Sequence, residues 1–222
     1  IGRENILLED PVINITLLQK DKYLVRTKSG KELISRKIIC TLPPNIFMNI
    51  MEPAPSPHLL KITNNLKFRS LRLSIIALNK DKFSNNASLY FPEKIYPFSR
   101  IYEPKNRSES MAPKNKTSLI VEVPCQKEDK IWKTEESKLR LKIQQKLMDA
   151  NFFSSEDLID SKIYRIHNAY PILEKNYRKK IAPIYHYLDQ FINLKMTGRN
   201  GLFAYTHIHD HMVNGRNIIN KI

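Results

Sequence analysis

Residues 198–215 hold the densest group of side chains in the chain that could do chemistry. The segment reads GRNGLFAYTHIHDHMVNG and contains three of the five glycines, Gly198, Gly201 and Gly215, together with Arg199 and Tyr205. Glycines let backbone N–H groups approach an anion closely, and an arginine adds a permanently charged, two-pronged donor. These residue types predict a turn that faces a phosphate, and a loop with polar decoration is the alternative.

Three of the six histidines, His207, His209 and His211, alternate within the same segment and enclose Asp210. On a β-strand this spacing would place the three imidazoles on one face, where they could converge on a divalent cation. On a helix the first two would be separated by about 200° around the axis. The metal interpretation is the weaker one, and we predict no metal site.

Other common catalytic motifs are missing from the sequence. No serine lies in a nucleophile elbow, and neither cysteine has a histidine near it in sequence. No Walker-type phosphate loop and no G-x-G-x-x-G fingerprint can be drawn from the five glycines, which excludes a self-contained Rossmann enzyme. Cys40 and Cys125 lie in apolar strand-like runs, so we expect buried thiols in a reducing, cytoplasmic compartment.

The chain of 222 residues carries a formal net charge of +15, which raises the question of a polyanion partner. The excess is spread evenly, with +8 in residues 1–111 and +7 in residues 112–222. Most of it is lysine, as a biased base composition would also produce. We expect no nucleic-acid partner, but a non-enzymatic basic module that binds polyanions stays as an alternative.

Two residues outside the 198–215 segment are further candidates for a binding site. Arg100 is a charged residue within the apolar run FSRIY, so it either faces solvent or points into a cleft toward an anion. Tyr170, in NAYPI, reads on its residues alone as packing at a sheet edge. The Lys, Tyr and Arg residues at 175–187 are explained by a solvated helix face.

The elements that must position these residues begin with three short β-branched runs, at 12–18, 23–27 and 32–40, which predict a three-strand meander ending in TLPP. A short helix is expected to follow, and then a proline-rich connection at 52–57. Further strands and helices follow along the chain. We expect strands at 71–79, 87–92, 98–104, 118–125, 162–172 and 192–196, and helices at 132–149, at 176–190 and from Asp210 or Asn214 onward.

These elements predict an α+β fold, a mainly antiparallel sheet backed by helices. At 41% hydrophobic residues the chain can bury a core. The sequence contains no run of 18 apolar residues of the kind that predicts a membrane span. The sequence starts at Ile rather than Met and stops abruptly at NIINKI, so we expect a piece of a longer protein.

Several stretches together resemble the C-terminal two-thirds of flavin-dependent amine oxidoreductases, the family related to UDP-galactopyranose mutase and protoporphyrinogen oxidase. They are TLPP (41–44), FSRIYEPKNRSESMAPKNKTSLIVEVPC (98–125), YPILEKNY (170–177) and YLDQFINLKMTGRNGLFAYTHIHDHMVNG (187–215). The tail motif, GR-N-G followed by a tyrosine and a polar stretch, is the specific part. The N-terminal βαβ unit that binds the ADP half of FAD in such proteins has no counterpart here.

The resemblance implies a division into domains. Residues 1–45 would form the meander of an incomplete FAD-binding domain, residues 46–194 the substrate-binding domain, and residues 195–222 a return to the FAD domain with the flavin-side turn and a terminal helix. It also implies FAD as the cofactor of the full-length protein, with hydride or electron transfer at the flavin and a small-molecule substrate, in one branch a nucleotide sugar. Without the missing region, the chain itself is expected to be inactive.

The resemblance also implies roles for individual residues. Those implied to approach the cofactor are Gly198, Arg199, Gly201, His209 and Asp210. Those implied to bind substrate are Arg100, Tyr170, Arg199, Tyr205 and His207. In the mutase branch the residues that match Arg199 and Tyr205 contact the substrate diphosphate. This chain departs from its relatives after the tyrosine, where it has Thr206 and the histidines.

Overall fold

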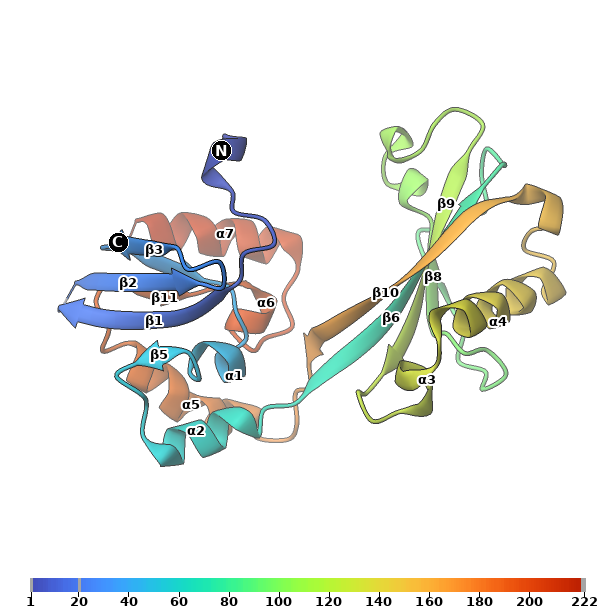
Figure 1. Cartoon of the computed structure of the whole chain (residues 1–222). Coiled ribbons are helices and arrows are strands. Elements are labelled where there is room, and N and C mark those ends of the chain that lie inside the picture. The colour runs from blue at the N-terminus through green and yellow to red at the C-terminus, as the bar shows by residue number, and fades with distance from the viewer. Residues whose placement is uncertain (1, 20, 221–222) are drawn as a thin grey trace. The chain divides into compact units, whose positions relative to one another are not determined.

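The computed structural model describes residues 2–19 and 21–220 and divides into two compact units. One unit comprises Ile1–Phe68 and Tyr170–Ile222, and the other comprises Arg69–Ala169 (Figure 1). The chain therefore passes between units at 68/69 and at 169/170, whereas the sequence placed its boundaries at 45/46 and 194/195. Residues 46–68 and 170–194 belong to the compact unit that contains both ends of the chain.

The discontinuous unit contains a four-stranded sheet in the order β3-β2-β1-β5. Its members are β1 (Val12–Gln19), β2 (Lys22–Thr27), β3 (Glu32–Ser35) and β5 (Met51–Glu52). The first three pair antiparallel, as the meander predicted, and β5 adds to β1 in parallel. The hydroxyl of buried Tyr23 donates to the carbonyl of Ile192 at 2.6 Å, which ties the meander to the C-terminal part of the chain.

The third run of the predicted meander, 32–40, is two strands rather than one. Ser35 ends β3, because its hydroxyl donates to the carbonyl of Lys37 and accepts from the N–H of the same residue, which turns the chain. The chain then forms β4 (Ile38–Cys40), which pairs in parallel with β11 (Leu194–Met196) in a separate two-stranded sheet. Residues more than 150 positions apart thus lie side by side immediately before the glycine segment.

Short helices surround these sheets in the same unit. An N-terminal 3-10 turn, η1 (Arg3–Asn5), precedes the sheet, and prolines begin α1 (Pro44–Phe47) and α2 (Pro57–Asn64). Ser56 caps α2 by accepting the N–H of Leu59. The helix predicted at 176–190 is α5 (Tyr177–Leu188), and its Pro183 lies inside the helix rather than in the first turn.

The 69–169 unit is built on a five-stranded sheet in the order β10-β6-β9-β8-β7, and β6, β9, β8 and β7 pair antiparallel, each with the next. Its strands are β6 (Phe68–Leu78), β7 (Leu89–Tyr90), β8 (Arg100–Tyr102), β9 (Thr117–Cys125) and β10 (Leu158–Pro171). Strand β6 begins at Phe68, one residue before the first unit boundary, and β10 ends at Pro171, two residues after the second. The α+β class and the mainly antiparallel sheet predicted from the sequence are confirmed.

One long helix, α4 (Glu136–Asp149), packs against this sheet (Figure 1). Leu139, Ile143 and Leu147 recur every four residues, form one apolar stripe and are buried against the sheet. The helix predicted at 132–149 is interrupted, since α3 (Lys130–Lys133) ends at Thr134, whose backbone is extended.

The segment between β8 and β9 is organised by a buried carboxylate. Glu103 is 1% exposed, and its two oxygens accept hydrogen bonds from the N–H groups of Phe83 and Ser84, both at 2.9 Å, from Thr117 Oγ1 at 2.5 Å and from Asn106 Nδ2 at 3.1 Å. The predicted loop at 105–118 contains two 3-10 turns, η2 (Pro104–Asn106) and η3 (Glu109–Met111). In the described part of the chain, no helix is long and apolar enough to cross a membrane.

Candidate functional site

The glycine segment begins where β11 ends, beside the end of β4. The N–H of Thr197 donates to the carbonyl of Cys40 at 2.8 Å, and the short helix α6 (Gly198–Gly201) follows. Gly198 has φ +76°, a left-handed conformation that residues with a Cβ adopt at a cost. A Cβ on Gly201 would lie 3.2 Å from the carbonyl oxygen of Cys40 and 3.4 Å from the backbone of Thr41. The glycines therefore allow the segment to lie directly on the TLPP turn.

Gly201→Ala is expected to destabilise the protein by about 1–2 kcal/mol, because the added methyl group meets fixed backbone rather than a flexible side chain. Gly215→Ala is the matched control. Gly215 lies in α7 (Ile208–Ile219) with open space around its Cβ position, so alanine there should stabilise by up to about 1 kcal/mol. Thermal unfolding followed by far-UV circular dichroism measures both, and shifts of the same sign would contradict the close approach of Gly201.

Arg199 is the centre of a cluster of predicted site residues. Its guanidinium carbon lies 5.3 Å from the ring centroid of Tyr170 and 5.0 Å from that of Tyr205. Its Nε and Nη2 donate to the carbonyl of Thr206, at 3.2 Å and 2.7 Å. Both aromatic contacts are within the range of cation–π attraction. The structure thus brings together Tyr170, Arg199 and Tyr205, although the sequence separates the first from the others by about 30 residues.

The histidines continue this cluster onto the start of α7. The ring of His207 meets Tyr205 edge-on with centroids 6.2 Å apart, and it stacks on His209 at 5.7 Å with the two planes 12° apart. His211 Nε2 lies 3.2 Å from the hydroxyl of Thr206. Two aromatic rings, two imidazoles and a guanidinium therefore form one continuous polar and aromatic surface.

The strand that would have put the three histidines on one face is not formed, because α7 begins at Ile208. Asp210 favours the helix, since its carboxylate accepts the N–H of His207 at 2.8 Å, at the position where helix starts need an acceptor. Among the described residues, no group of three or more histidines, cysteines and carboxylates is arranged to hold a metal ion.

The hydrogen bond between the His207 N–H and the Asp210 carboxylate, which caps the start of α7, is expected to weaken in acid. The hydrogen bond from the His207 backbone, and to a smaller extent the nearby histidines, lower the pKa of Asp210 below its ordinary 3.8. Because the folded pKa is the lower one, the stabilisation is present above pH 3.8 and is lost as pH falls through the lowered value. An NMR titration of the Asp210 carboxyl carbon should show the lowered midpoint, and α7 amide shifts should follow it. In Asp210→Asn this acid transition should disappear from the α7 amide shifts, whereas Asp149→Asn should leave it unchanged; a midpoint at or above 3.8 would contradict the cap.

Arg100, the remaining predicted substrate-binding residue, lies in the 69–169 unit. Its guanidinium forms a two-pronged ion pair with Glu122, the residue directly opposite it on β9, and lies 5.5 Å from the Tyr102 ring centroid. The side chain is 28% exposed. Its role toward a substrate therefore stays a prediction, and the structure adds that a carboxylate already holds this arginine.

The sequence matches the model of one protein family over residues 4–154, and that family is described as UDP-galactopyranose mutase. The match covers about two thirds of the chain. The chain belongs to the UDP-galactopyranose mutase family. The resemblance seen in the residues is thereby confirmed at the level of the family, and no curated protein matches the chain.

Solved structures agree with this family in their fold. The crystal structure of reduced UDP-galactopyranose mutase matches with a TM-score of 0.68 at 22% identity, over 88% of this chain and 41% of that protein. A provisionally named protoporphyrinogen oxidase from Exiguobacterium sp. 255-15 gives 0.71 at 16% identity, over 97% and 46%. A putrescine oxidase variant gives 0.62 at 11% identity, over 99% and 50%. This member of the mutase family thus spans half or less of the length of these proteins.

Three contributors to the site were missed in the sequence. Thr41 packs against Gly198 and Gly201, Thr206 supplies the carbonyl that holds Arg199, and the hydroxyl of Tyr185 donates to the carbonyl of Gly201 at 2.8 Å. Thr41 acts by packing and Thr206 through its backbone carbonyl, and no pattern of residue types in the sequence predicts either role. Burial raises the pKa of the Tyr185 phenol, so this group serves as a hydrogen-bond donor and not as a base.

The cysteines of this mutase-family chain are placed as the sequence predicted. Cys40 and Cys125 are both buried and free. Burial raises the pKa of the Cys40 thiol to about 11 and that of Cys125 above its ordinary value. Neither thiol is therefore an activated nucleophile at neutral pH.

Proposed function

We propose that this chain is the substrate-binding part of an FAD-dependent oxidoreductase of the amine oxidase-like class, with a nucleotide sugar as substrate. The arrangement of Arg199 between Tyr170 and Tyr205 carries the proposal. A guanidinium flanked by two phenols and followed by imidazoles presents charge and hydrogen-bond donors suited to a diphosphate, with aromatic faces suited to a sugar or a base. Membership of the UDP-galactopyranose mutase family supports the nucleotide sugar.

The residues of this chain fit only part of an FAD molecule. The sequence has no glycine-rich dinucleotide turn, so the ADP half of the cofactor would be held by residues outside it. We assign Gly198, Arg199, Gly201, His209 and Asp210 to the cofactor side, in the unit that contains both ends of the chain. Of the residues that we assign to the substrate, Tyr170, Arg199, Tyr205 and His207 lie in that same unit, and Arg100 lies in the 69–169 unit.

In this proposal the flavin, when bound, supplies hydride or electron transfer, and the protein groups orient the substrate. Arg199 would bind the diphosphate by direct hydrogen bonds from the guanidinium N–H groups other than the two that it donates to the Thr206 carbonyl. Tyr205, 60% exposed, would donate from its hydroxyl beside it. We further propose a cytoplasmic location, which the buried thiols support.

The test is a comparison of two preparations. The 222-residue chain alone is expected to remain colourless after FAD is added, and the same chain expressed with the residues encoded upstream of it is expected to purify with the absorption bands of oxidised flavin. A longer protein that stays colourless after titration with FAD would overturn the proposal. Binding of UDP to the yellow preparation, measured by calorimetry, then tests the nucleotide sugar separately.

A further inference from the structure

A buried arginine lies at the start of α4 in the 69–169 unit. Arg72, on β6, is 0% exposed, and its Nη1 donates to the carbonyls of Trp132 and Thr134, both at 2.9 Å. These two carbonyls lie at the junction between α3 and α4. The Nε and Nη2 groups of Arg72 are also buried, and none of the described residues accepts a hydrogen bond from them. Buried donors of a charged group are costly when no acceptor reaches them, so this guanidinium favours an added anion.

The carboxylate that faces these free donors is held loosely. Glu136, the first residue of α4, places its Oε1 4.0 Å from Arg72 Nη2 and 3.4 Å from Arg165 Nη1. The first distance is too long for a hydrogen bond, and the second is long for one. The Glu136 side chain is 54% exposed, so its carboxylate is also in contact with water. One oxygen of an exposed side chain thus lies between two guanidinium groups and fully satisfies neither.

Arg165 brings a second positive charge to this point. It lies on β10, and its guanidinium carbon is 6.0 Å from the ring centroid of Trp132. Burial lowers the pKa of Arg72, and repulsion by the charge of Arg165 lowers it further, whereas the attraction of Glu136 raises it by a smaller amount. The single carboxylate therefore does not offset the repulsion between the two arginines.

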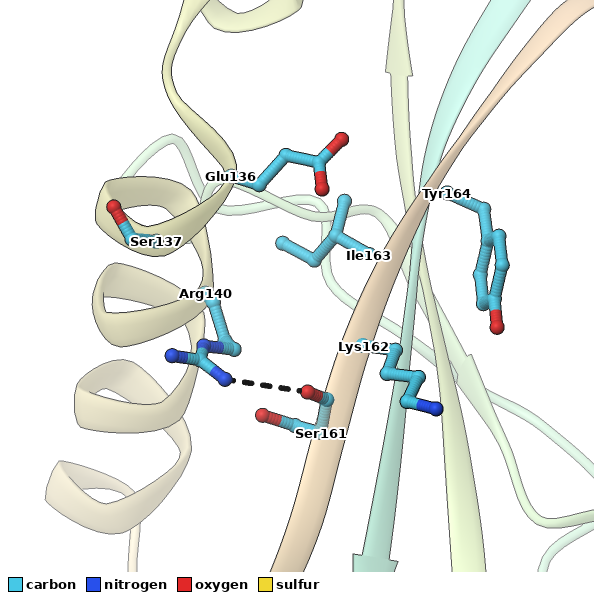
Figure 2. A pocket seen from close by; sticks show the side chains of 7 residues that line it. All are labelled: Glu136, Ser137, Arg140, Ser161, Lys162, Ile163 and Tyr164. Atoms are coloured by element: carbon cyan, nitrogen blue, oxygen red, sulfur yellow. Dashed lines mark hydrogen bonds between the residues drawn. The ribbon is translucent and has the colours of Figure 1, made fainter.

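Open space adjoins this pair of arginines. A pocket of about 420 Å³ lies between α4 and β10 and is lined by Glu136, Ser137 and Arg140 from the helix and by residues 161–164 from the strand (Figure 2). Figure 2 shows the Glu136 carboxylate near one end of the group and, farther along the helix, Arg140, which donates to the carbonyl of Ser161 at 3.4 Å. The volume is in the range of small-molecule sites.

The polar groups around the pocket can serve a ligand with both a charge and hydroxyl groups. The hydroxyl of Ser161 accepts from Gln144 Nε2 at 2.7 Å, which leaves its own proton for an acceptor. Arg140 makes only a long hydrogen bond to a carbonyl, so its guanidinium can turn to a ligand. Glu135, the residue before α4, makes no capping hydrogen bond, and the first turn of the helix adds positive potential.

We propose that the 69–169 unit binds a small phosphate monoester with a hydroxylated carrier, such as a sugar phosphate, whose phosphoryl group displaces the Glu136 carboxylate from between Arg72 and Arg165. A phosphate monoester carries about two negative charges near pH 7 and has three acceptor oxygens, so it can serve both guanidinium groups at once. The carrier would lie in the pocket, against Arg140 and the Ser161 hydroxyl.

This site lies on the face of the sheet opposite to Arg100. Arg72 is paired with Val123, which packs in the same core cluster as the α4 stripe. Arg100 is paired with Glu122, the neighbour of Val123 on β9. Since successive residues of a strand point to opposite faces, a ligand beside α4 does not contact Arg100. The proposed phosphate site is therefore independent of the nucleotide-sugar proposal.

Titration of the 222-residue chain with glucose 6-phosphate tests the proposal. The fluorescence of Trp132, which lies beside Arg165, is expected to change and to saturate with a Kd below about 1 mM. Inorganic phosphate should compete, and glucose should not. The absence of a saturable change up to about 10 mM would overturn the proposal.

Three variants, compared by calorimetry, locate the ligand. Arg165→Gln should weaken binding about tenfold or more, since it removes a charged donor. Glu136→Gln should strengthen binding severalfold, because it removes the carboxylate that competes for the same donors. Lys142→Gln is the matched control, with the same loss of charge at an exposed position of α4, and should change the affinity less than twofold. Equal losses for Arg165→Gln and Lys142→Gln, or weaker binding by Glu136→Gln, would reject the site.

Hydrogen exchange of the wild-type chain decides the matter should a variant fail to fold. Glucose 6-phosphate should protect the peptides that span 134–141 and 158–167, which contain both walls of the pocket. Protection confined to residues 198–215 would show that the phosphate binds at the Arg199 cluster instead, and would overturn the proposal.

Discussion

Glu103→Gln is expected to lower the free energy of unfolding of the 69–169 unit by about 3 kcal/mol. The carboxylate is buried and accepts four hydrogen bonds, two on each oxygen. An amide of the same shape replaces one acceptor oxygen by an NH₂ group that faces two donors. The hydroxyl of Thr117 can rotate to accept, but whichever oxygen is replaced, the backbone N–H of Phe83 or of Ser84 loses its acceptor. A buried donor left without an acceptor costs its full desolvation.

Trp132, the only tryptophan of the chain, is buried in the same unit, so its fluorescence reports the unfolding of that unit in urea. Thr117→Val, which removes one of the four donors, should cost about 1 kcal/mol. Glu109→Gln makes the same chemical change at an exposed position of the same loop and should cost less than about 0.5 kcal/mol. Equal effects of the two Glu→Gln variants would show that Glu103 does not organise the loop.

This carboxylate also shows which parts of the fold were predictable from the sequence. The strands β6 and β9 and the stripe of α4 follow from local periodicity, since alternation and a four-residue repeat of apolar residues are written in neighbouring positions. Glu103 binds segments that start 20 residues before it and end 14 residues after it. The residues next to Glu103 in the sequence do not distinguish it from a solvent-exposed glutamate. The segment 105–118 could therefore be predicted only as a loop.

The split of the meander has a similar cause. ELISRKIIC reads as one strand because its residue types suit a strand throughout. The break depends on two hydrogen bonds between Ser35 and Lys37, and the new partner of β4 is β11, at the other end of the chain. Parallel pairing across more than 150 residues leaves no local signal in either strand, so the sequence could not assign it.

The candidate site was predictable where chemistry is concentrated in one segment. Arg199, Tyr205 and the histidines were selected because glycine, arginine and imidazole gather between 198 and 215. Tyr170 read as packing on its own residues, and only its contact with Arg199 in the fold gives it a place in the cluster. Glu122 had a visible signal that was missed, a single acid in the apolar run LIVEV, matching the single base in FSRIY.

Arg199→Ala is expected to weaken binding of UDP to the flavin-containing protein by about 2 kcal/mol, roughly thirtyfold. The guanidinium lies between two aromatic rings and makes two hydrogen bonds to one carbonyl, so it is held in position before any ligand arrives. Part of the expected loss of affinity therefore comes from removing the positive charge, and part from removing a donor group that is already oriented. Arg199→Lys separates the two, because lysine keeps the charge but cannot present a planar fork, and it should recover only a part of the affinity.

Arg216→Ala is the matched control, because it removes the same charge from an exposed residue of α7 close in sequence to the site. If Arg199 binds the diphosphate directly, calorimetry should show the thirtyfold loss for Arg199→Ala and less than a twofold change for Arg216→Ala. Equal losses for the two variants, falling together as salt is raised, would mean that the net charge of +15 attracts the anion without a specific site. That outcome would favour a basic module over a nucleotide-sugar site, because a diffuse field treats every arginine alike and a built site does not.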